Sequence, residues 1–192
     1  SYTIRDYLGD LVWTPIRTIA TGIGQGITTV TPIAVARYIS ALVNGGTVYD
    51  AHVVQKVLDS KGNTVYETEP VVYNQLNVND EDLNAIKEGM KDVISGEDAT
   101  TATRQFEDCI YKDQLGGKTG TAQVNNINLE NNSWFVAFAP YDKPEIAIVV
   151  FIPSGYAGGY SGYTVRVIAE HYLDQKYNTQ TDEVPEKDSI VY

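Results

Sequence analysis

The stretch QLGGKTGTAQV, residues 114–124, is compatible with two kinds of chemistry. Gly-Gly-Lys-Thr can end a phosphate-binding loop, whereas Lys-Thr-Gly can form a strand edge beside an acyl substrate. A phosphate loop needs a glycine at position 112, which is Lys112 here, and a helix directly after the loop. The residues after Gly120 are poor helix formers. The stretch therefore predicts a β-strand over residues 117–124.

Further strands are predicted on both sides of this stretch. Residues 52–68 contain two β segments around a turn at residues 59–62. The apolar runs SWFVAFAP (133–140) and EIAIVVFIP (145–153) are joined by a short turn with proline, which predicts an antiparallel hairpin. Together with residues 117–124, these strands are expected to form one antiparallel sheet with helices packed on it, an α+β arrangement.

Three helices are predicted from capping residues and from apolar side chains at helical spacing. The first follows Thr31, with Pro32 in its first turn. The second follows Asn79, and the third covers residues 161–173. The residues expected to face the core are Ile33, Ala36, Ile39, Leu42 and Val43 in the first helix, Leu83, Ile86, Met90 and Val93 in the second, and Val165, Ile168, Ala169, Tyr172 and Leu173 in the third.

The remaining segments are predicted to be less regular. Residues 1–31 are rich in turns, and their glycines at positions 22, 24 and 26 lack the G-x-G-x-x-G spacing of a dinucleotide-binding turn. Residues 95–113 are expected to form a loop with room for a short helical turn. Residues 178–192 form a polar tail after a domain of residues 1–177. Trp134 is expected in the core.

The charge and cysteine content exclude several classes of function. The chain has 14 Lys and Arg against 25 Asp and Glu, a net charge of −11, whereas nucleic-acid binders need basic surfaces. Cys109 is the only cysteine, and a buried structural role is favoured for it over a nucleophilic one. No zinc-binding spacing of His or Cys appears. No metal, cofactor or nucleic-acid partner is therefore predicted, and no apolar run is long enough to span a membrane.

Five segments, taken in order, resemble a known protein family. They are GIGQGITTVTPIAVARYISALVNGG (22–46), AHVVQKVLDSKGN (51–63), GGKTGTAQV (116–124), SWFVAFAP (133–140) and GYAGGYSGYTVRVIAEHYL (155–173). Their order resembles the C-terminal part of the transpeptidase domain of penicillin-binding proteins. The sequence KTGTAQ, and the absence of Asp directly before SWF, look more like the monofunctional class B enzymes than the bifunctional class A enzymes.

This resemblance implies roles for the Lys-Thr-Gly strand, which lines the active-site cleft in the family. Lys118 and Thr121 are the expected catalytic residues: Lys118 would bridge to a Ser-x-Asn motif and assist proton transfer, and the Thr121 N–H would form half of an oxyanion hole. Thr119 and Thr121 would bind the carboxylate or amide of a donor peptide or of a β-lactam. Gly120 and Gln123 complete the expected substrate-binding strand.

Two of the three catalytic motifs of the family do not occur in this chain. Its serines stand at positions 1, 40, 60, 95, 133, 154, 161 and 189, and none has Lys three residues later or Asn two residues later. We therefore expect the C-terminal portion of a serine-type D,D-transpeptidase that cross-links peptidoglycan stem peptides, inactive in isolation. The parent protein is expected at the extracytoplasmic face of a bacterial membrane, held by an N-terminal anchor. An unpaired sheet edge favours a dimer or a companion fragment.

Other functions remain open at this point. A catalytically inactive penicillin-binding-like module, used for sensing or scaffolding, would have the same fold, and only upstream Ser-x-x-Lys and Ser-x-Asn motifs would distinguish the enzyme from it. A nucleotide-binding protein would be stabilised by ATP and magnesium but not by a β-lactam. A β-lactamase shares Lys-Thr-Gly but is less similar to residues 22–46.

Overall fold

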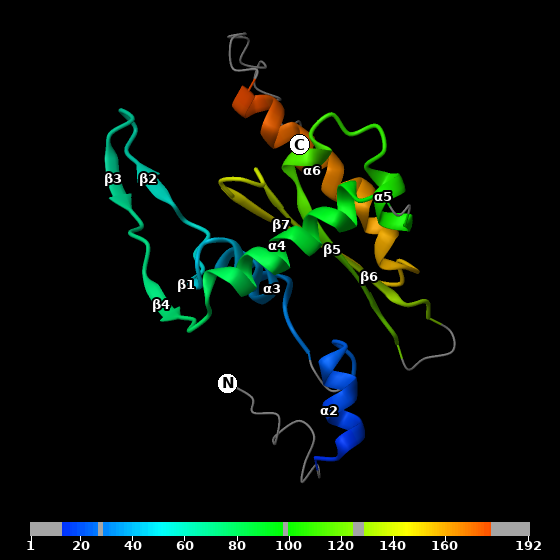
Figure 1. Ribbon diagram of the computed structural model, residues 1–192. Coiled ribbons are helices and arrows are strands. Elements are labelled where there is room, and N and C mark those ends of the chain that lie inside the picture. The colour runs from blue at the N-terminus through cyan, green and yellow to red at the C-terminus, as the bar shows by residue number, and fades with distance from the viewer. Residues whose placement is uncertain (1–12, 27–28, 98–99, 125–128, 178–192) are drawn as a thin grey trace.

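The predicted Lys-Thr-Gly strand lies at one edge of a three-stranded antiparallel sheet (Figure 1). The structure is a computed structural model that describes residues 13–26, 29–97, 100–124 and 129–177. The sheet has the order β5-β6-β7, and its strands are Gly116–Ala122, Asn132–Ala139 and Ile146–Ile152. The predicted strand and the predicted hairpin after it are therefore confirmed.

Alternation along β6 gives this sheet two apolar faces. Phe135 points to one face, while Trp134, Val136 and Phe138 point to the other. The register places Trp134 opposite Phe151 of β7, so each face continues from strand to strand. Because both faces are apolar, the strands appear in the sequence as continuous hydrophobic runs.

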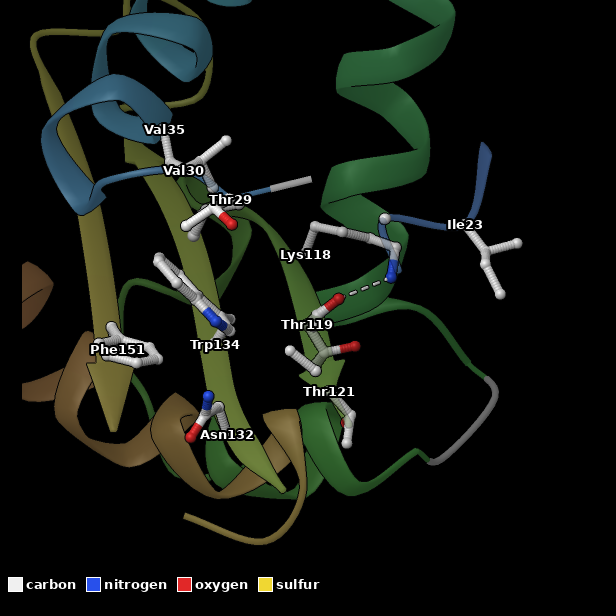
Figure 2. A pocket seen from close by; sticks show the side chains of 14 residues that line it. Ile23, Thr29, Val30, Val35, Lys118, Thr119, Thr121, Asn132, Trp134 and Phe151 are labelled. Carbon is white, nitrogen blue, oxygen red and sulfur yellow. Dashed lines mark hydrogen bonds between the residues drawn. The ribbon is translucent and has the colours of Figure 1, made fainter. Parts of the chain in front are cut away.

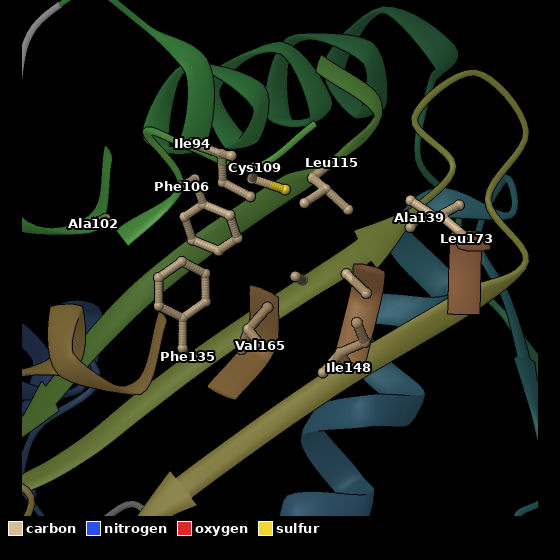
Figure 3. Packing of buried hydrophobic residues seen from close by; sticks show 12 residues of the cluster. Ile94, Ala102, Phe106, Cys109, Leu115, Phe135, Ala139, Ile148, Val165 and Leu173 are labelled. Carbon is tan, nitrogen blue, oxygen red and sulfur yellow. The ribbon is translucent and has the colours of Figure 1, made fainter. Parts of the chain in front are cut away.

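Helix α6, Gly162–Tyr177, covers the face that contains Phe135 (Figure 3). Val165, Ala169 and Leu173 of this helix are fully buried in the same cluster as Phe135. Side chains from the segment before β5 complete the cluster, among them Ile94, Phe106, Cys109 and Leu115. This cluster is the main core, and it joins α6 to the sheet.

Helices α3, Pro32–Val43, and α4, Asp80–Ser95, enclose a smaller cluster on the other face. Phe138 of β6 lies at its centre and is fully buried. Both predicted N-caps are confirmed, since Thr31 and Asn79 accept hydrogen bonds from backbone N–H groups three residues later. The residues that pack around Phe138 are Ile39, Leu42, Leu83 and Met90.

Three of the predicted core positions are exposed. Those that are buried are Ile39, Leu42, Leu83, Met90, Val165, Ala169 and Leu173. Ile33 is 58% exposed, because burial in α3 begins only at its second turn. Ile86 and Ile168 are also exposed. Ile94, which was not predicted to face the core, is completely buried against β5.

The expectation of a single sheet is wrong. Residues 52–68 do form the predicted hairpin, but its strands β2, Lys56–Leu58, and β3, Thr64–Glu67, make a separate two-stranded sheet. A third sheet pairs β1, Thr47–Tyr49, with β4, Val72–Gln75. Figure 1 shows the β2–β3 hairpin extending away from the main sheet as an arm. Every residue of β2 and β3 is exposed, so the side chains of this arm are not packed against the main sheet.

Two segments predicted to be irregular contain helices. Residues 15–22 form α2, Pro15–Gly22, which contradicts the irregular structure predicted there. Gly22 ends this helix and the glycines at positions 24 and 26 follow it, so the cluster does not follow a strand, which agrees with the exclusion of a dinucleotide-binding turn. Residues 95–113 were predicted as a loop with room for a short helical turn, and the short helix α5, Thr101–Gln105, agrees with that prediction. The 3-10 helices are η1, Lys112–Gln114, and η2, Gly158–Ser161. Within the described ranges, no helix has the length and apolar character to cross a bilayer. The predicted tail lies outside the described residues.

Candidate functional site

A cleft of about 430 Å³ lies between the edge strand β5 and the segment that leads into α3 (Figure 2). Ile23 and Val30 line it from the side of that segment. Of the five predicted site residues, four line this cleft: Lys118, Thr119, Gly120 and Thr121. Gln123 lies just beyond the end of β5 and is not among the lining residues. The Lys-Thr-Gly strand is therefore one wall of a cavity large enough for a small ligand.

Two aromatic side chains line the cleft next to this wall. The rings of Trp134 and Phe151 lie 4.4 Å apart between centroids, and Figure 2 shows them side by side on the sheet. The prediction that Trp134 belongs to the core is wrong, because this side chain is only partly buried and lines the cleft. The alternation along β6 could have separated Trp134 from the buried Phe135, since adjacent residues of a strand face opposite sides.

The Lys118 side chain is exposed at the rim of the cleft. Its ammonium group donates a hydrogen bond to the backbone carbonyl of Thr119 at 2.9 Å (Figure 2). The ion pairs found within the described ranges are formed by other residues. The positive charge of Lys118 is therefore available to a carboxylate or another anionic group that enters the cleft.

The backbone of Thr121 faces away from the rest of the sheet. Its carbonyl accepts a hydrogen bond at 2.9 Å from the side-chain amide of Gln25, which lies outside the sheet. The N–H and C=O of one strand residue point to the same side, so the Thr121 N–H also points toward the open edge. An N–H that points out of the sheet is not used by the sheet's own hydrogen bonds and can donate to a group that lies beside the strand.

The Thr121 hydroxyl is held by the loop between β7 and α6. The backbone N–H of Gly158 donates a hydrogen bond to the Thr121 Oγ1 at 2.9 Å. A Cβ atom added at Gly158 would lie 2.5 Å from the carbonyl oxygen of Gly120, so only glycine lets this loop approach β5 so closely. Because Oγ1 already accepts a hydrogen bond from Gly158, its own hydrogen remains free to be donated to a ligand.

A buried pair of serines fixes this loop in turn. Ser133 of β6 and Ser161 of η2 are both fully buried, and their hydroxyl groups are hydrogen-bonded to each other. Ser133 also donates to the backbone carbonyl of Ala157 at 2.8 Å, directly before Gly158. Neither serine reaches the cleft, so we assign this pair to positioning the loop rather than to nucleophilic attack.

Cys109 lies in the core cluster, away from the cleft-lining residues. It is 4% exposed, and burial raises the pKa of its thiol to about 11. A thiol that stays protonated at neutral pH is a poor nucleophile. The predicted structural role of this residue is confirmed by its burial.

Gln25, like the cleft-lining Thr29 and Asn132, is a polar residue at the site that was not predicted from the sequence. Its side chain contacts the backbone at both Thr121 and Gln123, almost one hundred positions away in the sequence. Gln25 stands between Gly24 and Gly26, whose φ angles are +74° and +87°. The paired glycines indicate a tight turn, but nothing in the local sequence specifies what that turn contacts.

The fold and the edge strand together define a transpeptidase-type α+β domain, and comparison with known proteins agrees. Residues 8–173 match the family described as penicillin binding protein transpeptidase domain. This match spans most of the chain, which therefore belongs to the penicillin-binding protein transpeptidase family. The predicted resemblance is confirmed.

Similar proteins include peptidoglycan D,D-transpeptidases of the MrdA type. The protein from Haemophilus influenzae is 31% identical over 179 residues, which cover 85% of this chain and 27% of the relative. The protein from Acinetobacter baumannii is 33% identical, over 84% of this chain and 25% of the relative. The solved penicillin-binding protein 2B from Streptococcus pneumoniae has a TM-score of 0.71 at 25% identity, over 90% of this chain and 29% of that one. The chain thus spans about a quarter of the length of its curated relatives.

Proposed function

We propose that this chain forms the Lys-Thr-Gly wall of the active site of a peptidoglycan D,D-transpeptidase. The observation that carries the proposal is the edge strand itself, with Lys118, Thr119 and Thr121 lining one cleft in a chain of this family. The names of the curated relatives support the same activity. The substrates we infer are peptidoglycan stem peptides, and β-lactams would act as their mimics at the extracytoplasmic face of a bacterial membrane.

The reaction proposed is serine acyl transfer. A serine hydroxyl adds to the carbonyl carbon of the donor peptide, its proton passes to a base, and the C–N bond breaks as the amine leaves. The amine of a second stem peptide then attacks the resulting ester and releases the serine. Each addition places negative charge on the carbonyl oxygen, so donors aimed at that oxygen accelerate both steps.

The described residues have separate roles in this scheme. The outward N–H of Thr121 stabilises the oxyanion, and its hydroxyl, with the Thr119 hydroxyl, binds the carboxylate or amide of the donor. Lys118 attracts the anionic end of the peptide and favours loss of the serine proton through its positive charge. Gly120 lets the donor lie close to the strand, and Gln123 extends that strand beyond the cleft.

The nucleophile is not among the serines of this chain in our proposal. None of them has Lys three residues later, and the buried Ser133–Ser161 pair is engaged with the Gly158 loop. We therefore infer that the nucleophilic serine is supplied from outside residues 1–192 and that the chain alone does not acylate. The same serine inventory favours one alternative, a catalytically inactive member of the family used for sensing or scaffolding.

A chimera tests this proposal. The chain would replace the matching segment of the Haemophilus influenzae relative, and covalent capture of a fluorescent penicillin would be followed on a gel. We expect the chimera to be labelled and the 192-residue chain alone not to be. Lys118→Ala should lower the labelling rate by about a hundredfold, the scale of losing one electrostatic contact to the transition state. Lys61→Ala, in the exposed turn of the β2–β3 arm, is the control and should leave the rate unchanged.

Two outcomes would contradict the proposal in different ways. Labelling of the isolated chain would show that it contains a nucleophile of its own. A folded chimera that is never labelled would instead favour the sensing or scaffolding alternative. Folding of the chimera is checked separately by thermal denaturation, because an unfolded chimera would also fail to react.

A further inference from the structure

Gln25 links the two walls of the cleft. Its neighbours Ile23 and Gly24 line the cleft on the side opposite β5. Its side chain crosses to β5, where Nε2 donates to the Thr121 carbonyl at 2.9 Å and Oε1 accepts from the Gln123 N–H at 3.3 Å. A primary amide carries its donor and acceptor side by side, so this one side chain satisfies two outward backbone groups of the edge strand.

The two glycines beside Gln25 place it there. Gly24 and Gly26 both have positive φ angles, a backbone conformation that glycine adopts without strain, so Gln25 lies in a tight turn. The Gln25 backbone N–H is itself bonded to the Ala20 carbonyl at 2.9 Å, which ties the turn to the end of α2. Gln25 is half-buried, and hydrogen bonds to backbone groups hold both its own N–H and its side-chain amide.

The strand needs such support at this point. Gly120 precedes Thr121, and glycine has the widest range of allowed backbone dihedral angles of any residue. The peptide plane between Gly120 and Thr121 carries the N–H that points to the open edge. The direction of this N–H depends on how firmly the Thr121 backbone is fixed. On the outer side of the strand, the hydrogen bond from Gln25 fixes it.

We propose that Gln25 is a positioning residue for acyl transfer: by pairing with the Thr121 carbonyl and the Gln123 N–H, it fixes the direction of the Thr121 N–H. The role rests on the proposed function, because the oxyanion is formed only in that reaction. Gln25 itself touches neither the substrate nor the reacting atoms. It acts as a one-residue substitute for a neighbouring strand at the end of β5.

The variant Gln25→Glu tests the two hydrogen bonds separately, because protonation of its carboxyl changes with pH. A carboxylate can accept from the Gln123 N–H, but it places an acceptor against the Thr121 carbonyl, which repels it. A protonated carboxyl has the shape of the amide and donates to that carbonyl again. As the pH falls from 7.5 toward 4.5, this variant should therefore recover relative to the unsubstituted protein, whereas Gln25→Ala should not.

The experiment uses two readouts. Amide hydrogen exchange of the 192-residue chain measures protection of the Gln123 N–H, and penicillin capture by the chimera measures the acylation rate. At pH 7.5 we expect both Gln25 variants to lower the acylation rate by about tenfold, because both lose the donor to the Thr121 carbonyl. Only Gln25→Ala should also lower the protection of Gln123 by about tenfold, because the carboxylate of Gln25→Glu still accepts from that N–H. Only Gln25→Glu should regain the acylation rate, relative to the unsubstituted protein, at low pH. Gln55→Glu, on the exposed segment before β2, is the matched control and should change neither.

Each contrary result has a distinct meaning. Unchanged protection of Gln123 in Gln25→Ala would overturn the bridge. Lost protection with an unchanged acylation rate would overturn the positioning role, leaving Gln25 as a structural contact. An unsubstituted chimera that folds but is never acylated would overturn the proposed function and the positioning role with it, while exchange at Gln123 would still decide whether the bridge exists.

Discussion

The two faces of the β5-β6-β7 sheet differ in how completely they are covered. Phe135 and Trp134 are adjacent in β6, yet Phe135 is 0% exposed under α6 whereas Trp134 is partly exposed in the cleft. Helix α3 covers the second face around Phe138. Next to the first turn of this helix, the rings of Trp134 and Phe151 are not covered and line the cavity. One strand thus contributes to the core on one side and to the candidate site on the other.

This contrast shows where stability and ligand binding can be altered separately. The covered face buries large side chains with no polar role, so a change there should affect folding first. The open face carries groups that no covering helix requires, so a change there should affect the cleft first. Substitutions on the two faces can therefore test this difference.

Phe135→Ala should produce the largest loss of stability. Phe135 is fully buried and packs against Phe106 at 5.7 Å between ring centroids, so truncation removes apolar contacts and leaves a cavity. The expected loss is about 3–5 kcal/mol in the free energy of unfolding. Trp134→Ala is the matched comparison and should cost less although Trp is larger, because its ring is already partly solvated. Urea denaturation of both variants measures the difference, and equal losses would contradict the contrast between the faces.

Cys109 should react about a hundredfold more slowly than a cysteine placed on the open face. It lies in the covered cluster, and burial raises the pKa of its thiol to about 11, so little thiolate forms at pH 8. The comparison is Thr29→Cys in a Cys109→Ala background, because Thr29 is exposed and lines the cleft. A chromogenic disulfide reagent measures both rates, and the rate for Cys109 should rise as the pH is raised. Similar rates at pH 8 would mean that the covered face opens readily.

The parts of the fold that the sequence predicts are those set by local pattern. The β6–β7 hairpin, the caps at Thr31 and Asn79, and the buried face of α6 follow from spacing and turn chemistry. The cleft wall follows from the Lys-Thr-Gly motif, because three consecutive residues specify that strand edge. Within these elements, the errors lie at positions such as Ile168, which has helical spacing with the buried residues of α6 but is exposed.

The parts that the sequence does not predict depend on distant partners. Gln25 meets β5 across 96 positions, and β1 pairs with β4 rather than with the main sheet. Trp134 lines the cleft rather than the core: alternation separates it from Phe135, but SWFVAFAP is apolar on both faces, so the sequence does not show which face a helix covers. Helix α2 exposes its isoleucines at positions 16 and 19, so its apolar residues do not mark a packed helix face.

Gly158→Ala should have an intermediate effect at the edge where the two faces meet. The added Cβ would lie 2.5 Å from the Gly120 carbonyl oxygen, so the loop must move and the hydrogen bond from residue 158 to Thr121 must weaken. We expect a loss of about 1–3 kcal/mol in unfolding free energy, and a slower acylation of the chimera.

Gly89→Ala is the control for this variant. Gly89 lies on an exposed side of α4, and a Cβ atom added there has no other atom within 4 Å, so the substitution should stabilise the chain by about 0.5–1 kcal/mol. A Gly158 variant as stable and as reactive as the unsubstituted protein would show that the loop does not hold Thr121.

Glu145→Gln should have the smallest effect, and one that depends on pH. The ammonium group of Lys176 and the hydroxyl of Tyr172, both on α6, donate hydrogen bonds to this carboxylate and join the covering helix to the turn before β7. The hydrogen bond from Lys176, with that from Tyr172, holds the pKa of Glu145 below its usual value of 4.5. The ionised carboxylate therefore contributes stability above about pH 5, and that contribution is lost as the pH falls through the lowered pKa. Urea midpoints of the unsubstituted chain and the variant should differ at pH 7 and converge as the pH is lowered toward 3, because the carboxyl becomes increasingly protonated and then resembles the amide. Glu69→Gln, on the exposed segment between β3 and β4, should show no such gap at either pH. A gap for Glu145→Gln that stayed constant over this range would mean that the contact between α6 and the sheet does not depend on the charge of Glu145.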